Sequence, residues 1–260
     1  MTIAAGFKFS DGLVLCTDTK HTYGGAMKLQ SAKIFRKEDD SGLKTAFCIV
    51  GSVRYCKMIV QKCEGALATL GPNEISRAEV KTVIETILLA IFQEHIYKHP
   101  DYAKGTLSAD FLIGIWSPTD GLGFYSTQDT AVNELVGYEC LGQGSYLGHY
   151  LIRPLFKDYL HLPEIIVLAT HALVQTKNFD DSCGGDSQFV YFHPDGSMSD
   201  VEYFDISQNE NYSKWFESTT KMIFYDLPNL KMSEEDFQSR LTKHTSFLAN
   251  IRENLKIQKS

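Results

Sequence analysis

No stretch of this sequence is long and apolar enough to cross a membrane. A spanning helix needs about 20 consecutive apolar residues, and the longest apolar runs, near 86–92 and 165–169, are far shorter. The first residues carry no basic segment and no cleavage-site pattern, so we expect no signal peptide. These absences predict a cytoplasmic protein.

Paired cysteines and excess positive charge are also lacking. The six cysteines form no Cys-x-x-Cys pair, which argues against a structural zinc site and favours reduced thiols in a cytosolic protein. They are Cys16, Cys48, Cys56, Cys63, Cys140 and Cys183. The 32 acidic side chains outnumber 25 basic ones, for a formal net charge of −7. Because nucleic-acid binding needs a positive face, this balance argues against such a partner.

The sequence has the composition of an ordinary globular protein, with 43% hydrophobic residues in a chain of 260. It shows no internal repeat. Its periodicity predicts strands at 3–9, 13–18, 33–35, 45–50, 111–116, 123–125, 134–141 and 188–192. It predicts helices near 56–70, 76–99, 164–177, 209–225 and 233–255. The clearest helix starts at Ser76 and Glu79, a capping-box pair. This order predicts an α+β domain with mostly antiparallel sheets.

The N-terminal segment resembles a known family. It contains Thr2-Ile3-Ala4, then Gly12, Asp18-Thr19-Lys20, Lys33-Ile34 and Gly51. This order looks like the start of a proteasome β-type subunit, in a wider group that includes the HslV peptidase and the Anbu proteins. The likeness continues through a Gly-x-Gly-Ser loop at 142–145 and through Asp180-x-x-Cys183-Gly-Gly, and so covers about residues 2–200.

The resemblance implies a fold and an assembly. The fold would be the four-layer αββα sandwich of N-terminal nucleophile (Ntn) hydrolases, over residues 1–204. Residues 205–260 would form a helical C-terminal extension packed on the same domain, similar to what Anbu-type proteins carry. Family members form rings, so we expect a homo-oligomer, and HslV-like members work with a separate ATPase unfoldase.

The implied chemistry is hydrolysis by an N-terminal threonine. If Met1 is removed, the α-amine of Thr2 lies beside its hydroxyl, and an amine with an ordinary pKa of about 8 can accept the hydroxyl proton. By resemblance, Lys33 lowers the pKa of both groups as a neighbouring cation. Asp18 would pair with Lys33, and the backbone N–H of Gly51 would bind the oxyanion.

Residue spacing gives an internal test of this alignment. Sixteen positions separate Thr2 from Asp18, as in the family, but fifteen separate Asp18 from Lys33, one fewer than usual. We place the missing residue in the Gly24-Gly25 turn. A gap inside the strand would instead turn Lys33 to the opposite face of the sheet.

Two loops depart from the family pattern. Gln143 stands where the family usually has serine between two glycines, and Cys183 replaces the serine of Asp-x-x-Ser-Gly. Asp180 and Cys183 are still assigned to the catalytic set by their place in the motif. A thiol is a poor hydrogen-bond partner for the terminal amine, so we expect a rewired or weakened proton network around that amine.

Substrate-binding residues follow from the same resemblance. In the family, the strand from Lys33 and the turn after Gly51 shape the first specificity pocket. The residues expected to line that pocket here are Lys20, Ile49 and Val53. Apolar walls favour an apolar side chain before the cut bond, whereas Lys20 favours an acidic one. His21 and Thr22 would flank the substrate backbone, which extended peptides usually meet by strand addition.

The function predicted is a threonine-type endopeptidase that cleaves peptides or unfolded proteins through an acyl-enzyme. No metal or cofactor is expected, because the eight histidines lack ligand spacing and no Gly-Lys-Ser/Thr follows the 142–145 loop. One alternative is a catalytically silent, proteasome-like scaffold subunit. Another is an Ntn amidase or acyltransferase acting on a small molecule or a specific peptide.

Overall fold

The computed structural model describes the chain apart from residues 1, 24–26, 40, 71–74, 202 and 258–260. The chain divides into two compact units, Met1–Ile206 and Ser207–Ser260. No helix within the described residues combines the length and the hydropathy that crossing a membrane requires. The packing of residues 205–260 on the rest of the chain stays a prediction.

The described strands are β1 (Ala4–Phe9), β2 (Gly12–Asp18), β3 (Lys20–Tyr23), β4 (Met27–Gln30), β5 (Ile34–Glu38), β6 (Lys44–Gly51), β7 (Ala109–Ser117), β8 (Gly121–Gln128), β9 (Ala131–Glu134), β10 (Tyr138–Leu141), β11 (Ser187–Phe192) and β12 (Met198–Asp200). The described helices are α1 (Val53–Leu67), α2 (Arg77–Ile91), α3 (Pro100–Ala103), α4 (Ser145–Ile152), α5 (Leu162–Phe179), α6 (Tyr203–Lys221) and α7 (Glu234–Ile257). Two π-helical turns, η1 (Phe92–Ile96) and η2 (Met222–Asp226), extend α2 and α6.

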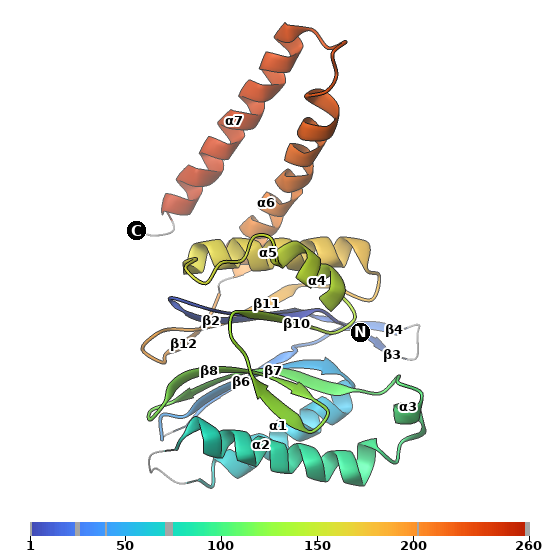
Figure 1. Ribbon diagram of the computed structural model, residues 1–260, viewed down its shortest axis with the longest axis vertical. Coiled ribbons are helices and arrows are strands. Elements are labelled where there is room, and N and C mark those ends of the chain that lie inside the picture. Colours follow the sequence, from blue (N-terminus) through green and yellow to red (C-terminus); the bar gives the residue numbers. More distant parts are fainter. Residues whose placement is uncertain (1, 24–26, 40, 71–74, 202, 258–260) are drawn as a thin grey trace. The chain divides into compact units, whose positions relative to one another are not determined.

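The first unit has four layers (Figure 1). Two antiparallel sheets, with strand orders β10-β1-β2-β11-β12 and β5-β6-β7-β8-β9, lie face to face. Helices α4 and α5 cover the first sheet, and α1 and α2 cover the second. The predicted α+β sandwich is therefore confirmed.

Alternation along the strands explains why both faces of the first sheet are buried. On β2, Leu13 and Leu15 face the other sheet, whereas Val14 and Cys16 face the helices. Successive side chains of a strand point to opposite faces, so a strand between two packed layers has no polar side. This burial fixes the ends of β1 and β2, where the candidate site lies.

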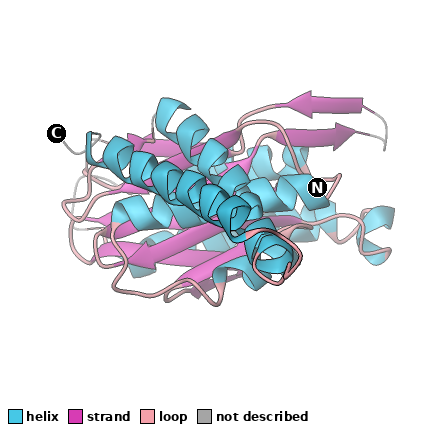
Figure 2. Cartoon of the chain, turned by 90° about the horizontal axis from the view of Figure 1, so that it is seen from above, coloured by secondary structure: helices cyan, strands magenta, loops and turns pink. Residues whose placement is uncertain are grey.

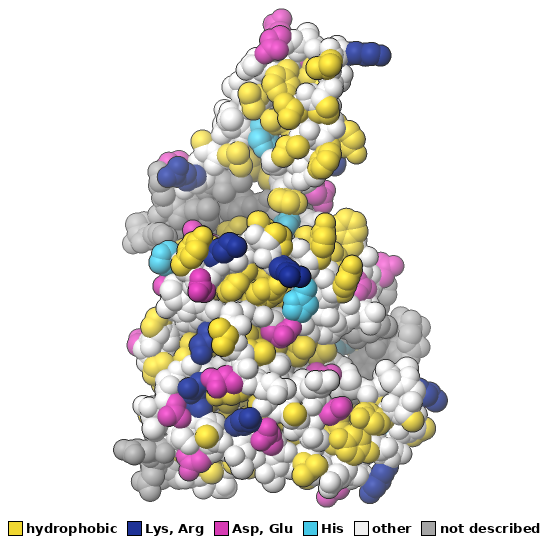
Figure 3. Space-filling model, in the orientation of Figure 1, with side chains coloured by type: hydrophobic (Ala, Val, Ile, Leu, Met, Phe, Trp, Pro, Cys, Tyr) yellow, Lys and Arg dark blue, Asp and Glu magenta, His cyan; other side chains and the backbone are white. Residues whose placement is uncertain are grey.

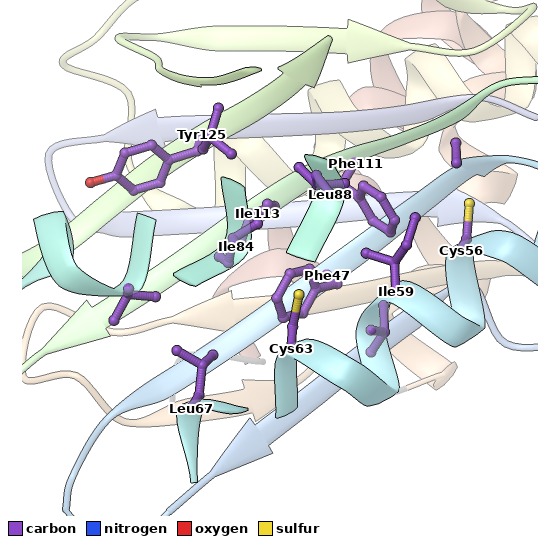
Figure 4. Packing of buried hydrophobic residues seen from close by; sticks show 14 of the residues in the cluster. Phe47, Cys56, Ile59, Cys63, Leu67, Ile84, Leu88, Phe111, Ile113 and Tyr125 are labelled. Carbon is purple, nitrogen blue, oxygen red and sulfur yellow. The ribbon is translucent and has the colours of Figure 1, made fainter. Parts of the chain in front are cut away.

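The outer face of the second sheet is closed by α1 and α2. Cys56, Ile59, Cys63 and Leu67 follow one face of α1 and are buried. They pack in one cluster with Ile84 and Leu88 of α2 and with Phe47 and Phe111 of the sheet (Figure 4). The predicted capping box at the start of α2 is also confirmed, since both of its reciprocal hydrogen bonds form.

Three local predictions need correction. The strand predicted at 134–141 is two strands in different sheets, β9 and β10, and Gly137 between them has φ +81°. The segment after the 142–145 loop is helix α4, which was not predicted. The two strands of the β3–β4 hairpin were also missed; the hairpin projects from the first unit (Figure 2). The predicted Gly24-Gly25 turn lies outside the described residues.

The second unit is built from two helices joined by a π-helical turn and a short loop. Within it, the rings of Trp215 and Phe247 stack, and His244 Nε2 lies 2.9 Å from Thr219 Oγ1. Many of its large apolar side chains are nevertheless exposed, and Figure 3 shows hydrophobic side chains over these helices. They are Phe216, Ile223, Phe224, Tyr225, Leu227, Leu230 and Leu248.

Candidate active site

The pairing of β1 with β2 brings two distant segments together. Ala4 pairs with Thr17, so the residue before β1 lies beside the last residue of β2. The junction is closed by hydrogen bonds from Thr17 Oγ1 and from the Asp18 N–H to the Ile3 carbonyl, at 2.9 and 3.2 Å. Thr2 and Asp18 are consequently neighbours, as the family resemblance implies.

Lys33 completes a cluster with these two residues. The Thr2 hydroxyl donates a hydrogen bond to Asp18 Oδ1, and Lys33 Nζ donates to Thr2 Oγ1. Lys33 Nζ also lies 2.7 Å from Asp18 Oδ1. All three side chains are buried, with exposures of 2% for Thr2, 0% for Asp18 and 1% for Lys33.

Backbone contacts hold Lys33 in place just before β5. Its N–H donates to Gln188 Oε1 at 2.8 Å, and its carbonyl accepts from the Ile49 N–H at 2.9 Å. These contacts fix the start of β5 against β6 and β11 and direct the lysine side chain inward. The shorter Asp18–Lys33 spacing therefore leaves Lys33 facing the cluster.

The buried charges of this cluster are mutually compensated. Besides Thr2 and Lys33, the backbone N–H groups of Ile3 and Gly184 donate to the Asp18 carboxylate, at 3.1 and 2.9 Å. A buried carboxylate needs such donors because it has lost its water. Burial lowers the pKa of the Lys33 ammonium, whereas the negative charge of Asp18 opposes that shift. A lysine tuned in this way is suited to work beside a nucleophile.

A glycine loop encloses Thr2 from the other side. The Gly144 N–H donates to the Thr2 carbonyl at 3.2 Å. Gly142 has φ +95°, and a Cβ on it would lie 2.3 Å from the Thr2 carbonyl oxygen. Only glycine allows this approach. Gln143, between the two glycines, is exposed.

The loop at 180–185 contacts the cluster through its backbone. The Asp180 carboxylate accepts from the N–H and the hydroxyl of Ser182, and within the described chain it forms no hydrogen bond with Thr2. Cys183 is 2% exposed, and burial together with the charge of Asp18 raises the pKa of its thiol to about 12. The thiol is therefore protonated near neutral pH and is no thiolate nucleophile.

The structure places Lys20 on this same loop. Its Nζ donates to the carbonyl of Asp181 and, at 3.2 Å, to that of Cys183. Its N–H donates to the Gly184 carbonyl at 3.0 Å. Lys20, which was expected in the specificity pocket, therefore binds the 180–185 loop, and this loop supplies the Gly184 N–H that donates to Asp18.

Among the other predicted residues, Ile49 contacts the cluster through its backbone, since its N–H donates to the Lys33 carbonyl at 2.9 Å. Gly51 ends β6 with φ +98° and is exposed, as an oxyanion donor must be. Ile49 is buried on β6, and Val53 is half-buried at the start of α1. His21 is buried on β3. Thr22 lies in β3, but its side chain is outside the described part.

Sequence reasoning missed two supporting residues. Gly184 was quoted in a motif but not recognised as the donor to Asp18, although the Gly-Gly pair after Cys183 was a signal for close backbone approach. Gln188 gave no signal, because its partner is 155 positions away.

The sandwich of two antiparallel sheets between helices is the fold of proteasome-type proteins, and the buried threonine, aspartate and lysine lie at one end of it. The chain belongs to the proteasome subunit family, whose model, described as "Proteasome subunit", matches residues 2–204. No curated protein sequence matches the chain.

Solved structures of Anbu proteins share this fold. Anbu (ancestral β-subunit) from Yersinia bercovieri is 15% identical with a TM-score of 0.74, over 89% of this chain and 100% of that one. A Gly-1 mutant of Anbu from Hyphomicrobium sp. strain MC1 is 14% identical with a TM-score of 0.71, over 86% and 99%. The Pseudomonas aeruginosa Anbu complex, solved as a helical assembly, is 14% identical with a TM-score of 0.70, over 84% and 95%.

Proposed function

We propose that this protein is a threonine-type endopeptidase whose nucleophile is the hydroxyl of Thr2. The observation that carries the proposal is that both Lys33 and Asp18 hydrogen-bond to that hydroxyl in a buried cluster. Membership of the proteasome subunit family supports the same chemistry. The substrate class is peptides or unfolded proteins.

In the proposed reaction, removal of Met1 frees the α-amine of Thr2. The amine accepts the hydroxyl proton while the oxygen attacks the scissile carbonyl carbon, and the proton then passes to the leaving amine. An ester to Thr2 remains, and water hydrolyses it to release the second product. Lys33 lowers the pKa of the hydroxyl as a neighbouring cation, and Asp18 keeps that ammonium charged and oriented.

The backbone N–H of Gly51 is the proposed donor to the oxyanion of the tetrahedral intermediates. Gly51 is the last residue of β6 and is exposed. Loss of one such donor costs about 3–4 kcal/mol of transition-state stabilisation in enzymes where it has been removed.

We further propose that copies of the chain assemble in the cytoplasm, with an ATPase unfoldase as a candidate partner. Support for assembly comes from the Anbu complex of Pseudomonas aeruginosa, which forms a helical assembly. The exposed apolar side chains of α6 and α7 offer surface for such contacts.

Labelling of the nucleophile tests the proposal. The purified protein is treated with a peptide epoxyketone, which reacts with both the hydroxyl and the amine of an N-terminal threonine, and is then mapped by mass spectrometry. We expect loss of Met1 and a label on Thr2, absent in Thr2→Ala and retained in Thr2→Ser. Retained Met1, or an unlabelled Thr2 under conditions that label a control Ntn hydrolase, would refute the proposal.

One observation favours a second candidate, a catalytically silent scaffold subunit. In the described chain, the side chains of Asp180 and Cys183 form no hydrogen bond with Thr2, and the protonated Cys183 thiol is a poor partner for an amine. A scaffold would assemble normally but leave Thr2 unlabelled, so the same experiment, read beside the oligomeric state of the protein, separates the two functions.

A further inference from the structure

We propose that a cavity between α6 and α7 binds a small carboxylate anion with an apolar body. The cavity has a volume of about 240 Å³ and lies entirely within the second unit. Its lining residues are Trp215, Ser218, Met222, Asp226, Arg240, Lys243 and His244. All of them follow residue 204, where the match to the family model ends, so the proposed peptidase reaction accounts for none of them.

Helical periodicity explains why these residues share one cavity. Residues three, four or seven positions apart lie on one face of a helix. Met222 of η2 follows Trp215 of α6 by seven positions, and on α7 Lys243 and His244 follow Arg240 by three and four. Because α6 and α7 lie side by side (Figure 1), the two faces meet and enclose the cavity.

One wall of the cavity is aromatic and held in place. The ring of Trp215 stacks on that of Phe247, and the His244 ring lies tilted beside it, with the two centroids 6.4 Å apart. His244 is 9% exposed, and its Nε2 lies 2.9 Å from Thr219 Oγ1. The Thr219 hydroxyl donates its one hydrogen to the Trp215 carbonyl, so it accepts from the ring N–H. These contacts keep an aromatic surface ready for an apolar group.

The polar side chains of the cavity leave hydrogen-bond donors and one positive charge uncompensated. Arg240 Nη1 lies 2.7 Å from Asp226 Oδ1, which neutralises that pair. Lys243 and Ser218 form no hydrogen bond or ion pair with any residue that the structure describes. Two cations and one anion therefore line the cavity. A single carboxylate matches the excess positive charge, whereas a phosphate dianion exceeds it.

A π-helical turn shapes the same cavity. In η2, the Leu227 N–H donates to the Met222 carbonyl at 2.9 Å, five positions back instead of four. Both ends of η2, Met222 and Asp226, line the cavity. Such turns within α-helices are rare and occur frequently at functional sites. This observation is independent of the charges and supports a ligand site at the same place.

A small apolar carboxylate fits these groups. Its oxygens accept from the Lys243 ammonium and the Ser218 hydroxyl, and charge-assisted hydrogen bonds are the stronger kind. Its apolar body packs on the Trp215 ring and on Met222. A cavity of about 240 Å³ is smaller than the roughly 300–1,000 Å³ of typical drug-sized sites, so the ligand is a small molecule. An amine would instead meet the like charge of Lys243.

Fluorine NMR of the full chain labelled with 5-fluorotryptophan tests the proposal. The chain has two tryptophans. Trp215 reports on the cavity, Trp116 on β7 is an internal reference, and Trp215→Phe assigns the two signals. The probes are 3-phenylpropionate, its amide and 3-phenylpropylamine. We expect a saturable shift of the Trp215 signal with the carboxylate, binding of the amide about tenfold weaker, the size of one charge-assisted contact, and binding of the amine weakest.

Variants test whether the lining charges select the carboxylate. Lys243→Gln should weaken binding of 3-phenylpropionate about tenfold, whereas Lys243→Arg should retain most of it. Lys221→Gln makes the same change at an exposed position outside the cavity and should have no effect. Asp226→Asn removes a competing carboxylate from Arg240 and should tighten binding several-fold, a gain that a merely structural role would not give.

Equal affinities for the carboxylate and the amide, an unchanged affinity in Lys243→Gln, or a shift without saturation would overturn the proposal. A Trp116 signal that moves together with that of Trp215 would also overturn it, because the probe would then bind the surface without selection. These measurements do not involve Thr2, so their outcome is separate from that of the labelling experiment on the proposed peptidase.

Discussion

The backbone N–H of Gly184 donates a hydrogen bond to Oδ2 of Asp18 at 2.9 Å, across 166 positions of sequence. The other carboxylate oxygen accepts from Thr2 and Lys33. The carboxylate therefore couples the 180–185 loop to the candidate nucleophile, and the geometry of that loop should control the reactivity of Thr2.

Lys20 should act as a positioning residue through this coupling. Lys20→Ala removes the ammonium from the carbonyls of Asp181 and Cys183, which frees the loop and weakens the Gly184 donor to Asp18. We expect about a tenfold fall in kcat, the scale of one lost hydrogen bond to a charged group, with little change in KM. Steady-state cleavage of a Leu peptide measures both.

Two further variants make the Lys20 experiment decisive. Lys20→Arg keeps a cation and should restore most of kcat, whereas Lys62→Ala removes an exposed lysine of α1 and should have no effect. A change confined to KM in Lys20→Ala would instead indicate that this side chain contacts substrate, as the sequence alone suggested.

The ionic pair at the centre of the site should be sensitive to the loss of one partner. Asp18→Asn leaves the buried Lys33 ammonium without its counter-ion, and breaking a buried pair in this way costs about 3–5 kcal/mol of unfolding free energy. Removing both charges with Asp18→Asn and Lys33→Met should recover much of that stability without recovering activity. Urea unfolding of wild type and of both variants measures these differences.

An exposed pair provides the control for this experiment. Lys104 lies 3.1 Å from Asp101, and the two side chains are 66% and 48% exposed. Asp101→Asn should therefore change the unfolding free energy by less than about 1 kcal/mol. If Asp18→Asn changes the unfolding free energy as little as Asp101→Asn does, the buried charges of Asp18 and Lys33 are not paired as described.

Gly142 should tolerate no side chain. Alanine there would adopt φ +95° and place its Cβ 2.3 Å from the Thr2 carbonyl oxygen. Gly105 has φ +68° with nothing within 4 Å of a Cβ, so Gly105→Ala isolates the backbone strain, about 1–3 kcal/mol. Gly142→Ala should cost clearly more in urea unfolding and should also slow labelling of Thr2. Equal losses in the two variants would mean that the 142–145 loop does not close on Thr2.

Local pattern predicted the parts of the fold that depend on neighbours in sequence. The strands predicted on either side of Asp11-Gly12 and the helix capped by Ser76 are confirmed, because a turn or a cap is decided within a few residues. The run at 134–141 misled the prediction, since the change of sheet at Gly137 depends on pairing with β1.

The candidate site was predicted from the family resemblance and not from local sequence pattern. Nothing local to Thr2, Asp18 or Lys33 marks them, and only their joint order and spacing, read by resemblance, placed them together. Lys20 shows the limit of that reading. Its partners lie 161 and 163 positions away in a loop whose course depends on the packed sheets, so its position could not follow from the sequence.

Burial of His21 should make stability depend on pH on the acid side. Burial and the charges of Lys33 and Lys57 hold the pKa of the folded ring at about 4, against an ordinary value of 6.5 for an exposed histidine, while Asp18 opposes them. Between these values the unfolded state binds more protons, so stability falls as pH drops through that window. The loss attributable to this ring is about 2–3 kcal/mol.

Urea unfolding from pH 7 to pH 4 should show that His21→Gln is less acid-sensitive than wild type, whereas His149→Gln, at a partly exposed position on α4, follows wild type. Parallel curves for all three proteins would mean that the His21 ring titrates normally and is open to solvent.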